Sequence, residues 1–431
     1  MMNRIILIGN GFDLAHGLPT SYTDFINDYW ENWAHILYHT NSHTASDGLT
    51  KISHNDTEAL WCNIIGHFMA DYGPFKKVPG KRIIESIISD TENCKIRMCP
   101  FFKAINKSIE EKNWVDIETE YYLLLKMLMK TGDNHYQNPQ DLDKELNIIK
   151  SKLIAYLSKI QEEHISSSLT DRIIEKIIFE PICPDDISVQ GQEAFQQFIK
   201  HKWDDAQSED ETERRQVSHN YGIDYFYFRS EIESYKRDND ELSKHIKKII
   251  GNEQNIARYY HLPDQILLLN FNYTSTANLY IPQGSEFKVN HIHGELGNDN
   301  NPIIFGYGDE LDEDYKSIAN LNDNEYLKNI KSIRYLETDN YRQLLRFIDS
   351  APYQIYVMGH SCGNSDRTLL NTLFEHRNCL SIKPYYHKKA DGTDNYINIV
   401  QNISRDFNDM TLMRDRVVNK GYCRPLVEPT H

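Results

Sequence analysis

The sequence predicts an α/β fold, a mostly parallel, doubly wound sheet that a large helical insertion interrupts. Short aliphatic runs, such as residues 5–8 and 266–269, have the composition of strands buried on both faces of a sheet. After about residue 262, such runs alternate with segments whose apolar residues have helical spacing, whereas helical patterns dominate before it. We therefore expect residues 1–25 and 262–431 to form a Rossmann-like domain and residues 26–261 to form a mainly helical insertion domain.

Composition and charge limit the classes of partner. The chain has 431 residues and a net charge of -16, which disfavours general electrostatic binding to nucleic acid. No apolar run approaches the length of a membrane-spanning helix, and the N-terminus lacks the layout of a signal peptide. We therefore expect a cytoplasmic protein without a membrane partner. The seven scattered cysteines contain no Cys-x-x-Cys pair, which predicts reduced thiols and no metal site of the zinc-ribbon kind.

The first strand runs directly into the turn Gly9-Asn10-Gly11, which Phe12 and Asp13 follow. Glycines allow a sharp turn and bring backbone N–H groups close to whatever lies above the strand end, as in a phosphate-binding loop. The third glycine of the dinucleotide fingerprint is missing. Taken alone, the sequence of this turn therefore favours a structural role, as an ordinary tight connection between a strand and a helix, over ligand binding.

A second glycine loop follows at Gly17-Leu18-Pro19-Thr20. Proline disfavours helical backbone at the residue before it, and Thr20 or Ser21 can cap a helix that begins around Tyr22. A loop of this composition can fold over a ligand.

The insertion is predicted to be mainly helical, and one of its helices carries a secondary site candidate. Asp116 and Glu118 lie near the start of that helix, where acidic residues favour the helix dipole. Together with Trp114 they form the secondary candidate, whose role the sequence leaves open. The predicted helices span residues 56–72, 114–130, 141–164 and 192–203.

After the insertion the sequence predicts five further strands, with helices at residues 331–350 and 395–407. The strands lie within residues 265–269, 287–294, 302–308, 354–358 and 379–386. Since ligands of open parallel sheets bind beyond the carboxyl ends of the strands, the residues at those ends are site candidates. Besides the first turn, the predicted strands end in Asn270-Phe271-Asn272-Tyr273-Thr274, His291-Ile292-His293-Gly294, Phe305-Gly306-Tyr307-Gly308 and Met358-Gly359-His360-Ser361.

The AbiH family of bacteriophage abortive infection proteins is the one that this chain resembles. The resemblance lies in residues 8–13, 17–25, 270–274, 291–294 and 359–361, with Trp114-x-Asp116-x-Glu118. That family is in turn similar to sirtuin (SIR2/DHS-like) NAD-binding domains. The resemblance implies a bacterial antiphage protein whose sheet domain takes NAD as substrate or ligand.

The resemblance also assigns roles by position. Gly9-Asn10-Gly11, with Phe12, is similar to the sirtuin loop that holds the NAD phosphates, and Gly17-Leu18-Pro19, with Thr20, to the loop beside the nicotinamide ribose. Asn272, followed by Tyr273, matches the asparagine near the nicotinamide, and His293-Gly294 matches the catalytic His-Gly pair. Gly359-His360-Ser361, with Asp366, resembles the loop that contacts the adenosine half.

Two departures from the sirtuin pattern bear on the activity. Thr274 stands where sirtuins carry aspartate, and the zinc module that helps to build an acyl-lysine channel is absent from the sequence. The absence of the zinc module favours related SIR2-like defence proteins that hydrolyse NAD over protein deacylases.

The chemistry that this implies is cleavage of the nicotinamide–ribose bond. A neutral imidazole at His293 can orient or deprotonate a ribose hydroxyl or a water. Asn272 can position the nicotinamide amide or the water, and Asp13 can bind a ribose hydroxyl or stabilise positive charge on the ribose. The structural alternative for His293 is a histidine that caps a strand end, and for Asp13 it is a helix N-cap. His291 lies on the same strand face and is the rival of His293.

The leading hypothesis is an NAD hydrolase that a phage-derived trigger activates, with the insertion gating activation or homo-oligomeric assembly. The alternative is a non-catalytic sensor that binds NAD, ADP-ribose or another small nucleotide and acts through a partner. A metal-dependent nuclease ranks lowest, because no strand end carries a compact set of metal ligands.

Overall fold

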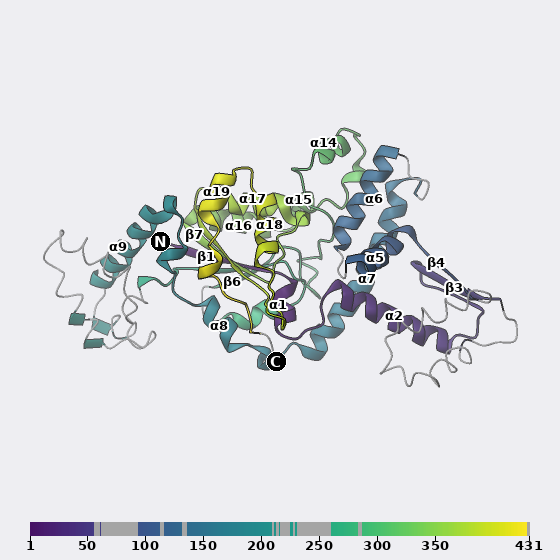
Figure 1. Ribbon diagram of the computed structural model, residues 1–431, viewed down its shortest axis with the longest axis horizontal. Helices are drawn as coiled ribbons and strands as arrows, with labels where there is room; N and C mark the ends of the chain where they lie inside the picture. Colours follow the sequence, from purple (N-terminus) through teal and green to yellow (C-terminus); the bar gives the residue numbers. More distant parts are fainter. Residues whose placement is uncertain are drawn as a thin grey trace. The chain divides into compact units, whose positions relative to one another are not determined.

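The computed structural model describes most of the chain, and these residues divide into two compact units (Figure 1). The first unit comprises Met1–His16, Ser166–Glu295 and Tyr335–His431, and the second comprises Gly17–Ile165 and Leu296–Arg334. The described residues are 1–55, 61, 94–112, 116–131, 136–208, 211–212, 215, 225–226, 229–230, 260–282 and 287–428.

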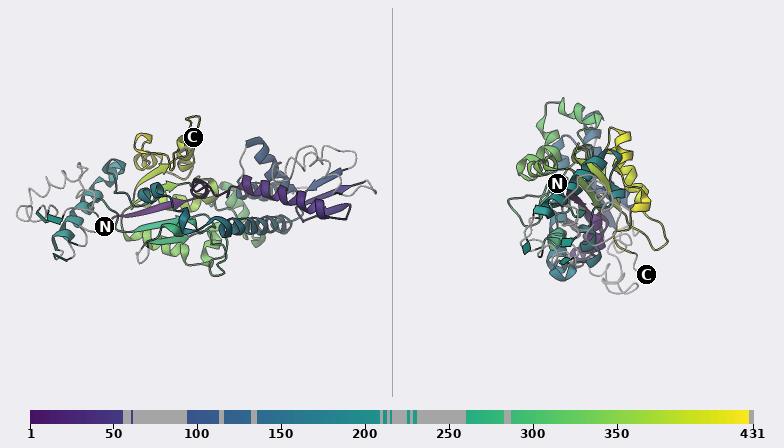
Figure 2. Two further views of the ribbon diagram at one scale, coloured as in Figure 1. Left: turned by 90° about the horizontal axis from the view of Figure 1, so that it is seen from below. Right: turned by 90° about the vertical axis from the view of Figure 1, so that its left-hand side faces the viewer.

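A five-stranded parallel sheet forms the centre of the first unit, with β1 in the middle (Figure 2). The strand order is β6-β5-β1-β7-β8, and each neighbouring pair is parallel. This arrangement confirms the predicted α/β fold and the mostly parallel sheet. The strands are β1 (Asn3–Ile8), β5 (Ile266–Asn270), β6 (Lys288–His291), β7 (Tyr353–Met358) and β8 (Cys379–Tyr385).

Both faces of this sheet are buried, which explains the continuous aliphatic runs in the sequence. Ile6 and Ile8 point to one face, where they share a core with Ile174 and Ile178 of α8 (Arg172–Ile178). Ile5 and Leu7 point to the other face and have no exposed surface either.

The winding of the sheet reverses at β1. From β1 the chain continues to β5 and β6 on one side, and then crosses to β7 and β8 on the other side. Loops that leave β1, β5, β6 and β7 therefore meet at one edge of the sheet. In open α/β sheets such a reversal opens a crevice at the carboxyl ends of the strands, where ligands bind.

Short helices complete the first unit, and α17, α18 and α19 pack beside β8 (Figure 1). The helix predicted at residues 395–407 is confirmed as α18, and the one at 192–203 as part of α9. Besides α8, the helices are α1 (Asn10–Ala15), α9 (Gln192–Ser208), α16 (Asn340–Ser350), α17 (Arg367–Phe374), α18 (Tyr396–Arg405) and α19 (Met410–Arg416).

The second unit is mainly helical. Ser21 caps α2 as predicted, because its hydroxyl accepts a hydrogen bond from the Asp24 amide while the Asp24 carboxylate accepts one from the Ser21 amide. Helices α2 and α7 lie side by side (Figure 2). The helices are α2 (Tyr22–His39), α5 (Pro100–Lys112), α6 (Ile117–Thr131), α7 (Pro139–His164), α14 (Glu313–Ala319) and α15 (Lys331–Arg334).

The sequence missed a small antiparallel sheet in the second unit. Its strands are β2 (Thr44–Ser46), β3 (Thr50–His54) and β4 (Cys94–Met98), in the order β2-β3-β4. These strands are short and rich in polar residues, so they carry little of the apolar alternation that marks a strand. The helix predicted at 56–72 lies outside the described residues, apart from residue 61.

The strand predicted within residues 302–308 is wrong. Ile303, Ile304 and Phe305 are buried, but they belong to an extended loop of the second unit and not to the sheet. Tyr307 stacks on Tyr122 of α6, with ring centroids 4.0 Å apart, so the apolar run is explained by packing on helices. An apolar run of this length does not distinguish a buried strand from a buried loop.

The two units also divide the chain differently from the predicted domains. Residues 166–208 pack with the sheet, since α8 contributes to its core. Residues 296–334 pack with the helical unit, where Lys331 pairs with Glu118. Among the described helices, none is both long and apolar enough to cross a membrane.

Candidate functional site

The turn after β1 is pressed against the turn after β7. The Gly11 amide donates to the Gly359 carbonyl at 2.9 Å, and the Gly9 amide donates to the Met358 carbonyl at 3.3 Å. A Cβ on Gly359, whose φ is +77°, would lie 2.1 Å from the Phe12 nitrogen. A Cβ on Gly11 would lie 2.8 Å from the Gly359 Cα. The glycines therefore serve backbone packing between two turns, and their amides are engaged within the fold.

Asp13 is a buried carboxyl at the same edge. It is 1% exposed and lies in α1, where Gly9 is the N-cap, so Asp13 does not cap this helix. Its Oδ2 accepts from the Thr274 hydroxyl at 2.6 Å, while its Oδ1 has no hydrogen-bond partner among the described residues. Burial raises the pKa of Asp13 to about 6, and the side chains of Thr274, Thr276 and Asn272 limit that rise.

The neighbouring Phe12 does not share this position. It has no exposed surface and packs within the core, 5.6 Å from the Tyr280 ring centroid. Phe12, predicted to contact a cofactor, is therefore a core residue in this structure.

Asn272 and His291 hold the loop after β5 in place. The Asn272 side-chain amide donates to the Gly9 carbonyl at 3.0 Å, which ties the ends of β5 and β1 together. His291 Nδ1 accepts from the Asn270 amide at 3.1 Å, and its Nε2 donates to Asn278 Oδ1 at 3.0 Å. Burial lowers the pKa of His291 and favours the neutral ring. With both ring nitrogens engaged, His291 has the contacts of a structural histidine.

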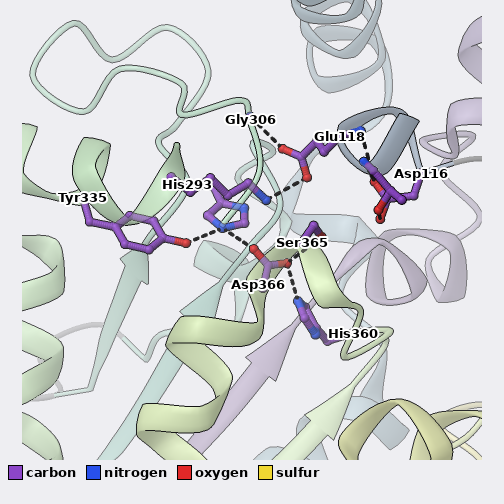
Figure 3. Close-up of polar contacts among 10 residues, drawn as sticks. Asp116, Glu118, His293, Gly306, Tyr335, His360, Ser365 and Asp366 are labelled. Carbon is purple, nitrogen blue, oxygen red and sulfur yellow. Dashed lines mark hydrogen bonds and ion pairs between the residues drawn. The ribbon is translucent and has the colours of Figure 1, made fainter. Parts of the chain in front are cut away.

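His293 lies in a different environment, at the centre of a polar cluster (Figure 3). Its Nε2 is 3.1 Å from Asp366 Oδ1 and 3.1 Å from the Tyr335 hydroxyl. The other oxygen of Asp366 lies 3.6 Å from His360 Nε2. Phe271 packs against both imidazoles, with ring centroids 5.1 Å from His293 and 4.1 Å from His360. The segments that follow β6 and β7 thus bring two histidines onto one carboxylate.

This cluster is buried within the first unit. His293, His360 and Asp366 are 4%, 6% and 7% exposed. Asp366 ends the short 3-10 turn Asn364–Asp366, the first element after β7, whereas His293 follows β6. A carboxylate that accepts from a histidine fixes the orientation of the ring and stabilises its protonated form, which suits proton transfer.

The remaining predicted residues of the first unit differ in their surroundings. Gly294 follows His293 with a φ of +90°, a value that favours glycine. Ser361 is exposed, and its carbonyl accepts from the Asn402 side chain at 2.7 Å. Tyr273 is buried, and Asn10 is half-buried.

Gly17, Pro19 and Thr20 belong to the second unit. Gly17 and Pro19 are exposed and Thr20 is buried. The Tyr156 hydroxyl of α7 donates to the Pro19 carbonyl at 2.5 Å, so this loop is anchored to its own unit.

The secondary candidate also lies in the second unit. Glu118 Oε2 accepts from the ammonium of Lys331 at 2.7 Å, and Glu118 Oε1 accepts from the Gly306 amide at 3.1 Å (Figure 3). Asp116 caps α6, since its Oδ1 accepts from the amides of Glu118 and Thr119. This finding confirms a helix-start role for Asp116, while Trp114 lies outside the described residues.

Sequence reasoning did not find Tyr335 or Lys331, because neither lies in a motif that distinguishes it from an ordinary surface residue. It found Asp366, but assigned it to the adenosine half of a nucleotide and not to His293. Within the described residues, no group of three or more His, Cys, Asp or Glu side chains is arranged to hold a metal ion.

Comparison with protein-family models gives one match. The model described as "Bacteriophage abortive infection AbiH" matches residues 5–387, a span that includes the turn after β1, the loop after β5, and the residues of the His293–Asp366–His360 cluster. Comparisons with curated proteins and with solved structures give no match.

Proposed function

This chain belongs to the bacteriophage abortive infection AbiH family, and we propose that it hydrolyses NAD at the carboxyl edge of its parallel sheet. The reaction would break the nicotinamide–ribose bond and deplete NAD in the cytoplasm of an infected cell. The observation that carries this proposal is the contact of 3.1 Å between His293 Nε2 and Asp366 Oδ1. A histidine oriented by a buried carboxylate is suited to general base catalysis.

The position of the contact supports a small-molecule site. His293 follows β6 and Asp366 follows β7, and these strands lie on opposite sides of β1, where the winding of the sheet reverses. Ligands of Rossmann-like sheets bind in the crevice at this point. A nucleotide such as NAD fits the chemistry of a sheet edge that offers imidazole, carboxylate and amide groups.

The residues at this edge divide the work of hydrolysis. In the proposed step, the oxygen of water bonds to ribose C1′ and its proton passes to His293. The bond from C1′ to the nicotinamide nitrogen breaks, and its electron pair stays with nicotinamide. Asn272, whose Nδ2 already donates to Gly9, keeps its Oδ1 to accept from the nicotinamide amide or from the water. Asp13, ionised above about pH 6, stabilises positive charge on the ribose.

A second candidate is a non-catalytic nucleotide sensor that acts through a partner. Such a sensor would bind NAD, ADP-ribose or another small nucleotide at the same strand ends without cleaving it. For the hydrolase and for the sensor alike, we expect a phage-derived trigger. The second unit or homo-oligomeric assembly would then control activation.

The test is nicotinamide release by the full-length protein. NAD is incubated with purified protein, alone and with lysate from phage-infected or uninfected cells, and nicotinamide is followed by chromatography. We expect release with infected lysate, its loss in His293→Ala, and its retention in His387→Ala, which changes an exposed histidine of the same unit. Binding of NAD or ADP-ribose without release, together with protection of cells by His293→Ala, would support the sensor and contradict the hydrolase.

A further inference from the structure

We propose that Asn270 is a positioning residue for the hydrolysis. Its side chain shapes the loop after β5, so that the Asn272 side-chain amide is held with its nitrogen on Gly9 and its oxygen toward the substrate. The role of Asn270 in the reaction rests on the proposed function, whereas its hold on the loop is a property of the resting protein.

The Asn270 side chain fastens the loop to the strand from which the loop leaves. Asn270 is the last residue of β5 and is 1% exposed. Its Oδ1 accepts from the Asn272 backbone amide at 3.1 Å, and its Nδ2 donates to the Thr274 carbonyl at 3.1 Å. Nδ2 also donates to Nδ1 of His291, the residue that pairs with Asn270 in β6, at 3.1 Å. One side chain therefore joins two points of the loop and the neighbouring strand.

The chemistry of these partners fixes the orientation of the Asn270 amide. A backbone N–H can only donate and a backbone carbonyl can only accept, so Oδ1 faces Asn272 and Nδ2 faces Thr274. Because Asn270 is buried, water cannot easily replace either bond. An ionised aspartate has no donor and a serine has a single hydroxyl, so asparagine is the short side chain that can make both bonds.

The loop in turn fixes the side chain of Asn272. Its Nδ2 donates to the Gly9 carbonyl at 3.0 Å, and the Phe271 amide donates to the Ile8 carbonyl at 2.9 Å. The backbone of Gly9 is packed so closely that a Cβ on it would lie 2.5 Å from the His360 Cα, so its carbonyl is a fixed point. With the Asn272 nitrogen on Gly9, the oxygen on the other arm of this half-buried amide is the atom that the loop offers to a substrate.

The same loop carries a second contact with the proposed site. The Thr274 hydroxyl donates to Asp13 Oδ2 at 2.6 Å. A displacement at the base of the loop would therefore move Asn272 relative to Asp13. Misplacement of a catalytic group by about 1 Å can cost about a hundredfold in rate. In this scheme Asn270 touches none of the reacting atoms and acts through Asn272.

The first test measures the loop in the resting protein. Full-length protein labelled with ¹⁵N-asparagine is studied by amide hydrogen exchange, and Asn272→Ala identifies the signals of Asn272. We expect slow exchange of the Asn272 backbone amide and of the Asn270 side-chain amide in the natural protein. Asn270→Ala removes both loop bonds and should accelerate exchange of the Asn272 amide by about tenfold or more. Asn419→Asp, a change of an exposed asparagine in the same unit, should leave it unaltered.

The second test measures nicotinamide release. Asn270→Ala should lower release by about a hundredfold, and Asn419→Asp should not change it. The double variant Asn270→Ala/Asn272→Ala should be no slower than Asn272→Ala alone, because a residue that acts through Asn272 has no effect left once that side chain is removed. A residue that only stabilises the fold would lower release in both backgrounds.

Three results would overturn the inference. They are fast exchange of the Asn270 side-chain amide in the natural protein, unchanged exchange of the Asn272 amide in a folded Asn270→Ala variant, and a double variant that is slower than Asn272→Ala by the factor that Asn270→Ala shows alone. The first result needs no variant, so it decides the matter even if Asn270→Ala does not fold, which circular dichroism checks. If exchange changes as expected but no condition releases nicotinamide, the hold of Asn270 on the loop stands and the proposed hydrolysis fails. The two failures are therefore distinguishable.

Discussion

The buried carboxyl of Asp13 yields a prediction about stability that does not depend on the activity. Burial raises its pKa from 3.8 to about 6 in the folded protein. Between these two values the folded state keeps a proton that the unfolded state releases, so the free energy of unfolding decreases as the pH rises. The stabilisation from the bound proton is fully present below about pH 3.8 and is lost as the pH rises through about 6. The difference between the two pKa values corresponds to about 3 kcal/mol in the free energy of unfolding.

Asp13→Asn removes the charge and keeps the shape of the side chain. The amide oxygen can still accept from the Thr274 hydroxyl, which donates to Asp13 Oδ2 at 2.6 Å. We therefore expect the advantage in stability of Asp13→Asn over the natural protein to be up to about 3 kcal/mol greater at pH 7.5 than at pH 4. Nicotinamide release should nevertheless be lost, because sites often keep a destabilising group that function requires.

Hydrogen exchange in urea measures this prediction. The amides of β1 report the stability of the sheet unit separately from that of the helical unit, and each variant is compared with the natural protein at the same pH. Asp339→Asn supplies the control, since it changes an exposed aspartate in the same unit. If the difference between Asp13→Asn and the natural protein is the same at pH 4 and pH 7.5, the assignment of a raised pKa to Asp13 is wrong.

Three further substitutions test other contacts. Gly359→Ala places a Cβ 2.1 Å from the Phe12 nitrogen and should prevent stable folding of the sheet unit, whereas Gly392→Ala, at a φ of +84° with no atom within 4 Å, should cost only about 1–2 kcal/mol in urea unfolding. Equal effects would contradict the close packing of the two turns. Lys331→Met leaves the buried Glu118 carboxylate without its ammonium and should cost about 3–5 kcal/mol, and adding Glu118→Gln should recover most of this loss. A double variant as unstable as the single one would contradict the pairing. Thr274→Val removes the hydroxyl that donates to Asp13, which should raise the pKa of Asp13 further. The loss of stability with rising pH, measured by hydrogen exchange, should then occur above about pH 6, and a loss at the same pH as in the natural protein would contradict the contribution of Thr274.

The sheet was predictable because its strands satisfy one simple pattern. β1 and β5 are buried on both faces, so their aliphatic runs mark them in the sequence. β7 and β8 are buried as well, with aromatic and aliphatic residues among polar ones. The same pattern failed at residues 303–305, which are buried in a loop of the helical unit and not in a strand. Burial of an apolar run is visible in the sequence, but the element that buries it is not.

The candidate site was predictable only in part. The strand ends identify His293, Asn272 and Asp13 as candidates, since parallel strands place their carboxyl ends at one edge. The contact between His293 and Asp366 depends on the path of the chain after β7, through a turn at Gly359 and a 3-10 turn that ends at Asp366. No periodicity or propensity encodes that path, so the partner of His293 required the structure.

The cellular concentration of NAD after infection tests the central claim most directly. Cells that carry the natural protein, His293→Ala or His387→Ala are infected with a phage that the natural protein restricts, and NAD and nicotinamide are measured by mass spectrometry over time. The account predicts that NAD falls and nicotinamide rises with the natural protein and with His387→Ala, while both stay level with His293→Ala. Restriction of the phage by the natural protein with no change in NAD would contradict it.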